Sequence, residues 1–131
     1  MSKLILCLLL IFNICICEET VKTRVFTQED AQSQLSVRNG EEFIIKLKSN
    51  ASTGFVWKFL NEAEAKKGIQ LVKKSFERPS SSDSKPLIGA PGYTLFHFKA
   101  VRSSNGPVPL KFSYARNTNA NTLTTFKILV K

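Results

Sequence analysis

The chain has 131 residues, the length of one domain, and its 19 Lys and Arg exceed its 10 Asp and Glu to give a net charge of +9. All three cysteines, Cys7, Cys15 and Cys17, lie at the N-terminus, so residues 18–131 can form no disulfide, cysteine nucleophile or cysteine-ligated metal site. The single histidine and the lack of a phosphate-binding glycine loop argue against an enzyme, and we expect no catalytic residue, cofactor or metal.

The first 17 residues are typical of a secretory signal peptide. Lys3 gives the segment a positive start, and residues 4–16 are almost wholly apolar. Cys15 and Cys17 are small enough for the −3 and −1 positions of a cleavage site. An uncleaved membrane anchor is the alternative, but the apolar run is short and lacks a stop-transfer flank, so we expect no stable membrane insertion. We expect a single domain over residues 18–131 that is secreted or held in the endosomal or lysosomal lumen.

The rest of the chain consists of short segments in which apolar and polar residues alternate, as in half-buried β-strands. We expect strands within residues 21–26, 43–48, 56–60, 69–76, 96–100, 110–114 and 126–130, and one helical turn within 61–67. Turn-forming residues separate them, as at Asn39-Gly40 and Asn105-Gly106-Pro107. The pattern predicts an all-β, immunoglobulin-like sandwich of about seven or eight strands without a disulfide, with Trp57 in its core.

The segment Asn50-Ala51-Ser52-Thr53-Gly54-Phe55 predicts an exposed turn that is tied to the core. Asn50 tolerates left-handed backbone dihedrals, and Gly54 adopts them without steric cost. The aromatic residues Phe55 and Trp57 follow and would anchor the next strand. Loops held in this way often carry binding function, although the same residues are also typical of a simple hairpin turn.

Two later segments agree with a binding role for this loop. Gly89-Ala90-Pro91-Gly92 precedes the alternating strand at 93–100, and Arg116 follows Tyr114 near the C-terminus. In this order the three segments resemble the chagasin family of cysteine-peptidase inhibitors, which carries N-P-T-T-G-F, G-x-G-G and R-P-x-W loops. The resemblance spans roughly Glu42 to Lys131.

The resemblance implies that the three loops form a wedge in the active-site cleft of papain-like cysteine peptidases. Thr53 would present backbone and a small hydroxyl over the catalytic cysteine and histidine. The Gly89 loop would follow the non-primed subsites, and Arg116 would pack on the primed side. The peptidase-binding residues implied in this way are Asn50, Ala51, Ser52, Thr53, Gly54, Phe55, Gly89, Ala90, Pro91, Gly92 and Arg116.

The chain departs from the family pattern in each loop. Ala51 replaces a proline, so the first loop loses one fixed φ, and Pro91 replaces a glycine, which removes a backbone donor. Asn117 and Thr118 stand where the third loop of the family has a proline and a further loop residue, and its tryptophan is missing. We therefore expect the third loop to contribute least to binding.

Asn50-Ala51-Ser52 is also an N-glycosylation sequon. A glycan on Asn50 would stand in the proposed contact surface. Either the sequon escapes modification or the inhibitor interpretation fails, and mass analysis of the secreted protein distinguishes the two.

The positive charge leaves a second function open. Lysines that alternate with apolar residues are typical of the solvated outer faces of strands: Lys46, Lys48, Lys58, Lys73, Lys74, Lys99, Lys111 and Lys127. If they cluster on one sheet face, they would instead indicate an adhesion or ligand-binding module for anionic glycans or membrane surfaces. Nucleic acid is a poorer partner because the signal peptide removes the chain from most of it. We expect a monomer that binds papain-like peptidases.

Overall fold

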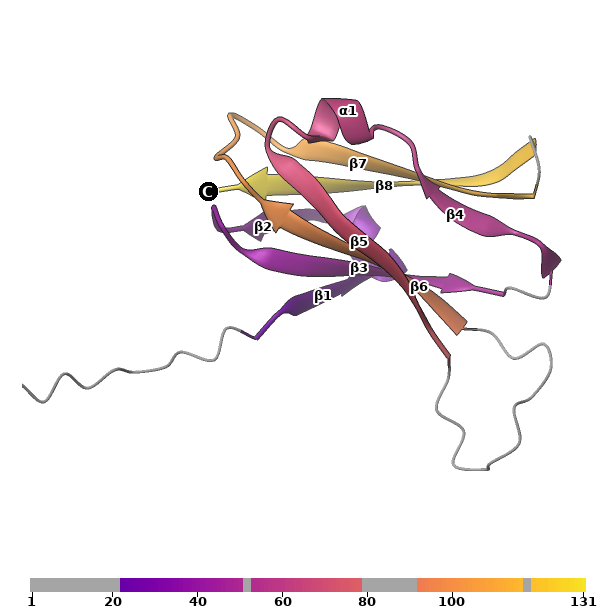
Figure 1. Cartoon of the computed structure of the whole chain (residues 1–131). Helices are drawn as coiled ribbons and strands as arrows, with labels where there is room; N and C mark the ends of the chain where they lie inside the picture. Colours follow the sequence, from indigo (N-terminus) through magenta and orange to yellow (C-terminus); the bar gives the residue numbers. More distant parts are fainter. Residues whose placement is uncertain (1–21, 51–52, 79–91, 117–118) are drawn as a thin grey trace, which may run out of the picture.

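The computed structural model describes residues 22–50, 53–78, 92–116 and 119–131. Its strands form two four-stranded sheets, one above the other in Figure 1, with little helix. The first sheet has the strand order β1-β3-β6-β5 and the second has the order β2-β8-β7-β4. The expected all-β sandwich is confirmed.

The strands are β1 Arg24–Thr27, β2 Gln34–Val37, β3 Glu42–Ser49, β4 Val56–Phe59, β5 Ile69–Glu77, β6 Gly92–Ala100, β7 Val108–Arg116 and β8 Asn119–Val130. A 3-10 helix, η2 (Gln28–Gln32), lies between β1 and β2. One helical turn, α1 (Glu62–Ala65), lies between β4 and β5, as expected. Among the described residues, no helix is long and apolar enough to span a membrane.

The N-terminal part of the sandwich differs from the sequence-based expectation. Strand β1 begins at Arg24, later than expected, and β2 was not foreseen at all. Only Leu35 and Val37 are apolar in β2, which is too short a pattern to show alternation. Both strands are stabilised by pairing with other strands of the sandwich: β1 pairs in parallel with β3, and β2 pairs in parallel with β8.

The core lies between the two sheets and receives alternate side chains of β3, β6 and β7 and of the C-terminal part of β8. Its largest fully buried side chains include Trp57, as expected, and Phe43, Phe96, Phe98, Phe112 and Phe126. Several of these rings touch, as Phe112 and Phe126 do with centroids 5.8 Å apart. Burial of each such ring contributes roughly 1.5–3 kcal/mol to folding, so the sandwich needs no disulfide.

The strand register decides which connections meet. Strand β3 ends at Ser49, which pairs with Gly92 at the start of β6. Strand β4 starts at Val56, which pairs with Ala115, and Arg116 at the end of β7 pairs with the first residue of β8. The β3–β4, β5–β6 and β7–β8 connections therefore leave the sandwich at the same end, on the right in Figure 1. We call this the three-loop end.

Lys74 does not lie on a solvated outer face, and that interpretation of it is wrong. It pairs with the buried Phe96, so it belongs to the inner face of its sheet. Its Nζ donates to the carbonyl oxygen of Trp57 at 2.7 Å and lies 5.4 Å from the Phe96 ring centroid. Burial, with the nearby charge of Lys58, lowers the pKa of Lys74. The side chain therefore ties β5 to β4 across the edge of the sandwich.

His97 lies on the outer face of the first sheet, because it alternates with the buried Phe96 and Phe98. Its Nε2 is 3.0 Å from the Ser75 hydroxyl oxygen on the neighbouring strand. Partial burial, followed by the charge of Lys73, lowers the pKa of His97 below 6.5. The folded domain therefore protonates His97 only at a lower pH than the unfolded chain does.

We expect His97 to reduce stability on acidification. The unfolded chain binds the His97 proton more readily than the folded one does, so this contribution to stability is complete above the unfolded pKa of about 6.5. It is lost as the pH falls through the lowered folded pKa. The thermal unfolding midpoint, measured between pH of about 7.5 and 5, should therefore fall less steeply in His97→Gln than in the wild type. Equal slopes for the two proteins would contradict this assignment.

Candidate functional site

The first loop at the three-loop end rises from a stack of aromatic rings. The rings of Trp57 and Tyr114 stack with centroids 4.8 Å apart and an interplanar angle of 25°. Phe55 packs against Tyr114 with a centroid distance of 5.3 Å. The Trp57 indole N–H donates to the Lys48 carbonyl oxygen at 3.0 Å, which joins the end of β3 to the start of β4. The base of the loop is therefore fixed on both sides.

Tyr114 also links the first loop to the third. Its hydroxyl oxygen accepts a hydrogen bond from the Asn50 backbone N–H at 3.0 Å. Tyr114 lies two residues before Arg116 on β7, so the strand that leads into the third loop holds the beginning of the first. From the sequence, Tyr114 was expected only as a strand residue. The alternation of β7 placed it on the inner face, but gave no sign of its partner.

Thr53 braces the turn from within. Its hydroxyl donates to the Asn50 carbonyl oxygen at 2.7 Å and accepts the Phe55 N–H at 3.4 Å. The Thr53 N–H also donates to the Asn50 carbonyl, at 3.2 Å. Thr53 is exposed, as expected. Its hydroxyl hydrogen, however, is donated within the loop and not to a partner. Such local side-chain hydrogen bonds favour a turn over regular structure.

Gly54 brings the first and third loops into contact. Its φ is +77°, a left-handed conformation that favours glycine. A Cβ atom at this position would lie 3.5 Å from Nε of Arg116, so the guanidinium side chain rests against the turn. The resemblance implied a contact role for Arg116. The structure adds that Arg116 supports Gly54.

Gly92 joins the second loop to the first through backbone packing. It pairs with Ser49, and a Cβ atom at Gly92 would lie only 2.8 Å from the Glu77 carbonyl oxygen. Glycine is therefore required where β5 and β6 approach. Two residues further along β6, the Thr94 hydroxyl donates to the Ser49 hydroxyl at 3.1 Å. The C-terminal root of the second loop is thus attached to the start of the first.

The structure brings together those predicted site residues that it describes: Asn50, Thr53, Gly54, Phe55, Gly92 and Arg116. Ala51, Ser52, Gly89, Ala90 and Pro91 lie outside the described residues. Phe55 is half-buried on Tyr114, which makes it mainly a support for the loop.

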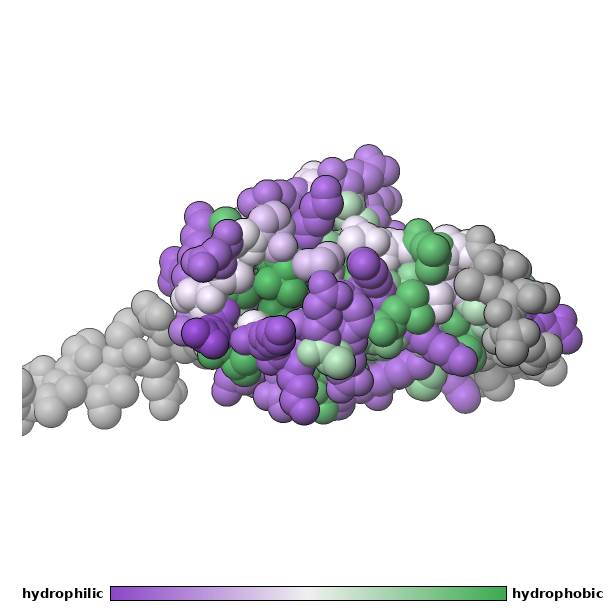
Figure 2. All heavy atoms as spheres, turned by 90° about the horizontal axis from the view of Figure 1, so that it is seen from above, coloured by the Kyte–Doolittle hydropathy of each residue, from purple (hydrophilic) through white to green (hydrophobic). Residues whose placement is uncertain are grey.

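The surface of this end is more apolar than the polar loop motifs suggest. Most of the face in Figure 2 is hydrophilic, and hydrophobic side chains show in separate places, one group of them beside the three-loop end at the right. Exposed apolar residues on the strands at this end are Val56, Leu123 and Phe76, the last with 68% of its surface accessible. An apolar surface around a polar turn suits contact with another protein.

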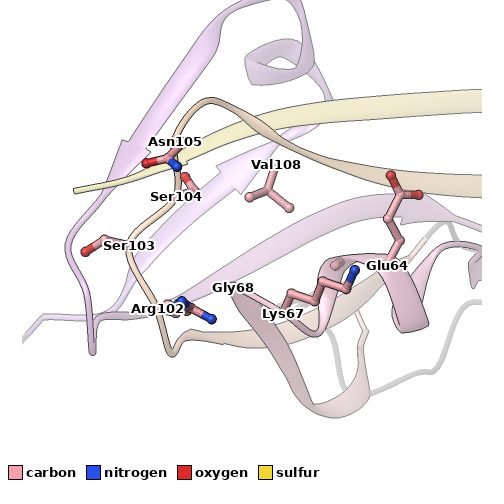
Figure 3. A pocket seen from close by; sticks show the side chains of 9 residues that line it. Glu64, Lys67, Gly68, Arg102, Ser103, Ser104, Asn105 and Val108 are labelled. Carbon is pink, nitrogen blue, oxygen red and sulfur yellow. The ribbon is translucent and has the colours of Figure 1, made fainter.

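Two cavities lie at the opposite end of the sandwich. One, of about 310 Å³, lies between α1, the start of β5 and the β6–β7 connection (Figure 3), with Glu64, Lys67 and Arg102 at its border. The other, of about 440 Å³, includes Arg24 and Glu41, which form a salt bridge of 2.7 Å. Neither shares a residue with the three loops. In the described ranges, no group of three or more His, Asp or Glu could hold a metal ion.

The chain was compared with known families and solved structures. The family "Chagasin family peptidase inhibitor I42" matches residues 36–130. The cysteine protease inhibitor EhICP2 from Entamoeba histolytica superposes with a TM-score of 0.66 and 16% identity, over 83% of this chain and 96% of that one. Amebosin superposes with a TM-score of 0.59 and 18% identity, over 84% of this chain and 99% of that one.

A third structure, PbICP-C in complex with falcipain-2, superposes with a TM-score of 0.49 and 20% identity, over 86% of this chain and 93% of that one. No curated protein sequence matches the chain. The cysteine protease inhibitor EhICP2 and Amebosin therefore share the sandwich fold of this chain at low sequence identity. The family match covers all strands from β3 to β8. The chain therefore belongs to the chagasin family of cysteine-peptidase inhibitors.

Proposed function

We propose that the chain inhibits papain-family cysteine peptidases reversibly by inserting its three-loop end into the active-site cleft. The contact between Gly54 and the Arg116 side chain carries this proposal, because it joins two of the three implied loops into one surface. The pairing of Ser49 with Gly92 attaches the root of the remaining loop to the same surface. Membership of the family supplies the class of target.

Inhibition without cleavage follows from the closed shape of the first loop. Hydrogen bonds from Thr53 to Asn50 hold the turn in a compact form that differs from the extended conformation of a substrate. A peptidase thiolate needs a carbonyl carbon at about 3–3.5 Å in an aligned geometry before it can attack. The turn occupies the cleft but places no carbonyl carbon in the aligned position that the thiolate needs for attack. Because no covalent bond forms, the complex is reversible.

The aromatic stack lowers the entropic cost of binding. Phe55, Trp57 and Tyr114 fix the loop before it meets the enzyme, whereas a flexible segment would lose about 0.5–1.5 kcal/mol for each ordered side chain. Inhibitors of this kind bury about 1,600 Å² of total surface. We expect the preorganised base to offset the loss of the fixed φ of the family's proline, which Ala51 replaces.

The alternative function, binding to anionic glycans or membranes, has weaker support. Lys46, Lys48, Lys73 and Lys99 do share the outer face of the first sheet. Lys46, Lys48 and Lys99 alternate with inward-facing residues, and Lys73 pairs with the outward-facing His97. Glu42 and Glu77 lie on the same face, and Glu77 forms a 3.2 Å salt bridge with Lys46. Lys74 faces inward and Lys111 belongs to the other sheet. The basic patch is therefore divided and partly neutralised.

The signal peptide over residues 1–17 and the release of the domain into the secretory pathway are part of the same proposal. These residues lie outside the described ranges. The charge pattern of the segment supports them. A secreted or endolysosomal inhibitor would meet papain-like peptidases in the compartments where such enzymes act, and its sandwich needs no cysteine for stability there.

The direct test is titration of residues 18–131 against papain. We expect reversible inhibition of peptide-substrate hydrolysis at nanomolar to low micromolar inhibitor, the range of affinities that protein inhibitors of standard interface size reach. The unglycosylated protein should be used, so that Asn50 carries no glycan. Full papain activity at micromolar inhibitor would reject the proposal.

Thr53→Arg should weaken inhibition at least about tenfold, because a long charged side chain at the centre of the turn would block close approach to the cleft. Thr53 is exposed, so the domain should keep its unfolding midpoint. Thr53→Ser is the matched control, since it keeps the hydroxyl that bonds to Asn50. If Thr53→Arg inhibits as well as Thr53→Ser, the turn does not enter the cleft.

Gly54→Ala and Gly40→Ala form a second matched pair. Both glycines have positive φ, +77° and +85°, so each alanine should cost about 1 kcal/mol of stability. Gly40 lies at the opposite end, where its N–H bonds to Ala100. We expect the inhibition constant for papain to rise about tenfold only in Gly54→Ala, because only there is the contact surface reshaped. Equal inhibition constants for the two variants would place the contact surface elsewhere.

A further inference from the structure

Phe76 is an aromatic residue whose position no loop motif explains. It lies near the end of β5 and pairs with Thr94 of β6, which is buried. Paired residues share one face of a sheet, so Phe76 belongs to the inner face. Nevertheless, 68% of its surface is exposed. An inward-facing phenylalanine normally lies in the core, so this exposure needs a structural reason.

The reason is that the second sheet does not reach far enough to cover it. Strand β4 starts only at Val56, and Lys74 on β5 bonds to the next residue, Trp57. Phe76 lies two residues further along β5, about 7 Å closer to the three-loop end. In Figure 1, the end of β5 turns away from β4 in this region. Phe76 therefore stands beyond the edge of the core, beside the inhibitory loops.

The ring is nonetheless held in place. The Nζ atom of Lys74 lies 5.7 Å from the Phe76 centroid, while its hydrogen bond to Trp57 at 2.7 Å fixes the ammonium group. This cation–π contact restricts the ring without covering it. An exposed aromatic group that is already ordered loses little entropy when a partner covers it.

We propose that Phe76 is a further contact and specificity-determining residue of the inhibitor. It binds an apolar surface on the target peptidase next to the rim of the active-site cleft. This inference rests on the proposed function, because the occupant is the same peptidase that receives the three loops. Continuity with those loops identifies the occupant: Phe76 lies one residue before Glu77, whose carbonyl oxygen packs against Gly92.

Phe76→Ala and Val72→Ala test the proposal. Val72 lies on the same strand with 56% of its surface exposed, but about 13 Å further from the three-loop end. We expect Phe76→Ala to raise the inhibition constant for papain about 10–30-fold, mainly through faster dissociation, and Val72→Ala to leave it unchanged. Phe76→Leu should fall between the wild type and Phe76→Ala. Unfolding midpoints of all variants separate lost binding from lost folding.

A crosslinking experiment excludes an indirect effect through Lys74. A photoreactive benzoylphenylalanine is placed at position 76 or at position 72, and each protein is illuminated with papain. We expect a covalent complex from position 76 only. If neither position crosslinks, if both crosslink equally, or if Phe76→Ala dissociates at the wild-type rate, the inference is overturned. If the wild type itself does not inhibit papain, the proposed function has failed before Phe76 is tested.

Discussion

The stacking of Tyr114 on Trp57 is the interaction on which the three-loop end depends. Trp57 is buried and bonded to Lys48, so it belongs to the core and cannot shift. Tyr114 extends this rigid base outward, because its ring supports Phe55 and its hydroxyl accepts the Asn50 N–H. A polar turn of small residues would be mobile in isolation. In this domain the base of the turn is fixed to the sandwich core, which lowers the entropic cost of binding.

A second constraint is the divergence of the two sheets toward this end. Lys74 marks the last position at which β5 still bonds to β4. Beyond it, Phe76 is exposed, while Gly92 at the start of β6 stays paired with Ser49 of β3. The same geometry therefore exposes an aromatic ring beside the three-loop end. The same strands form both the core and the binding surface. On β5 the boundary between the two lies at Lys74.

Much of the fold could be predicted from the alternation of residues within single strands. The buried positions of β3, β6 and β7 follow the period of two seen in Phe43-Ile44-Ile45 and Phe96-His97-Phe98. Alternation did not predict β2, because this strand has only two apolar residues. It also gave a wrong prediction for Lys74, whose side chain lies on the inner face of its sheet. In both cases the outcome depends on a partner from a distant part of the chain. Local periodicity contains no information about that partner.

The class of the fold, the order of the three loop motifs and their resemblance to the chagasin family could all be recognised in the amino-acid sequence. Thr53 and Gly54 also predicted a tight turn, because their local chemistry favours one. Three further features became visible only in the folded chain: Arg116 rests on Gly54, Tyr114 holds Asn50, and Phe76 stays uncovered. These contacts join residues more than 50 positions apart or depend on where the opposite sheet ends. Strand register and sheet divergence set them, and neither can be read from a single segment.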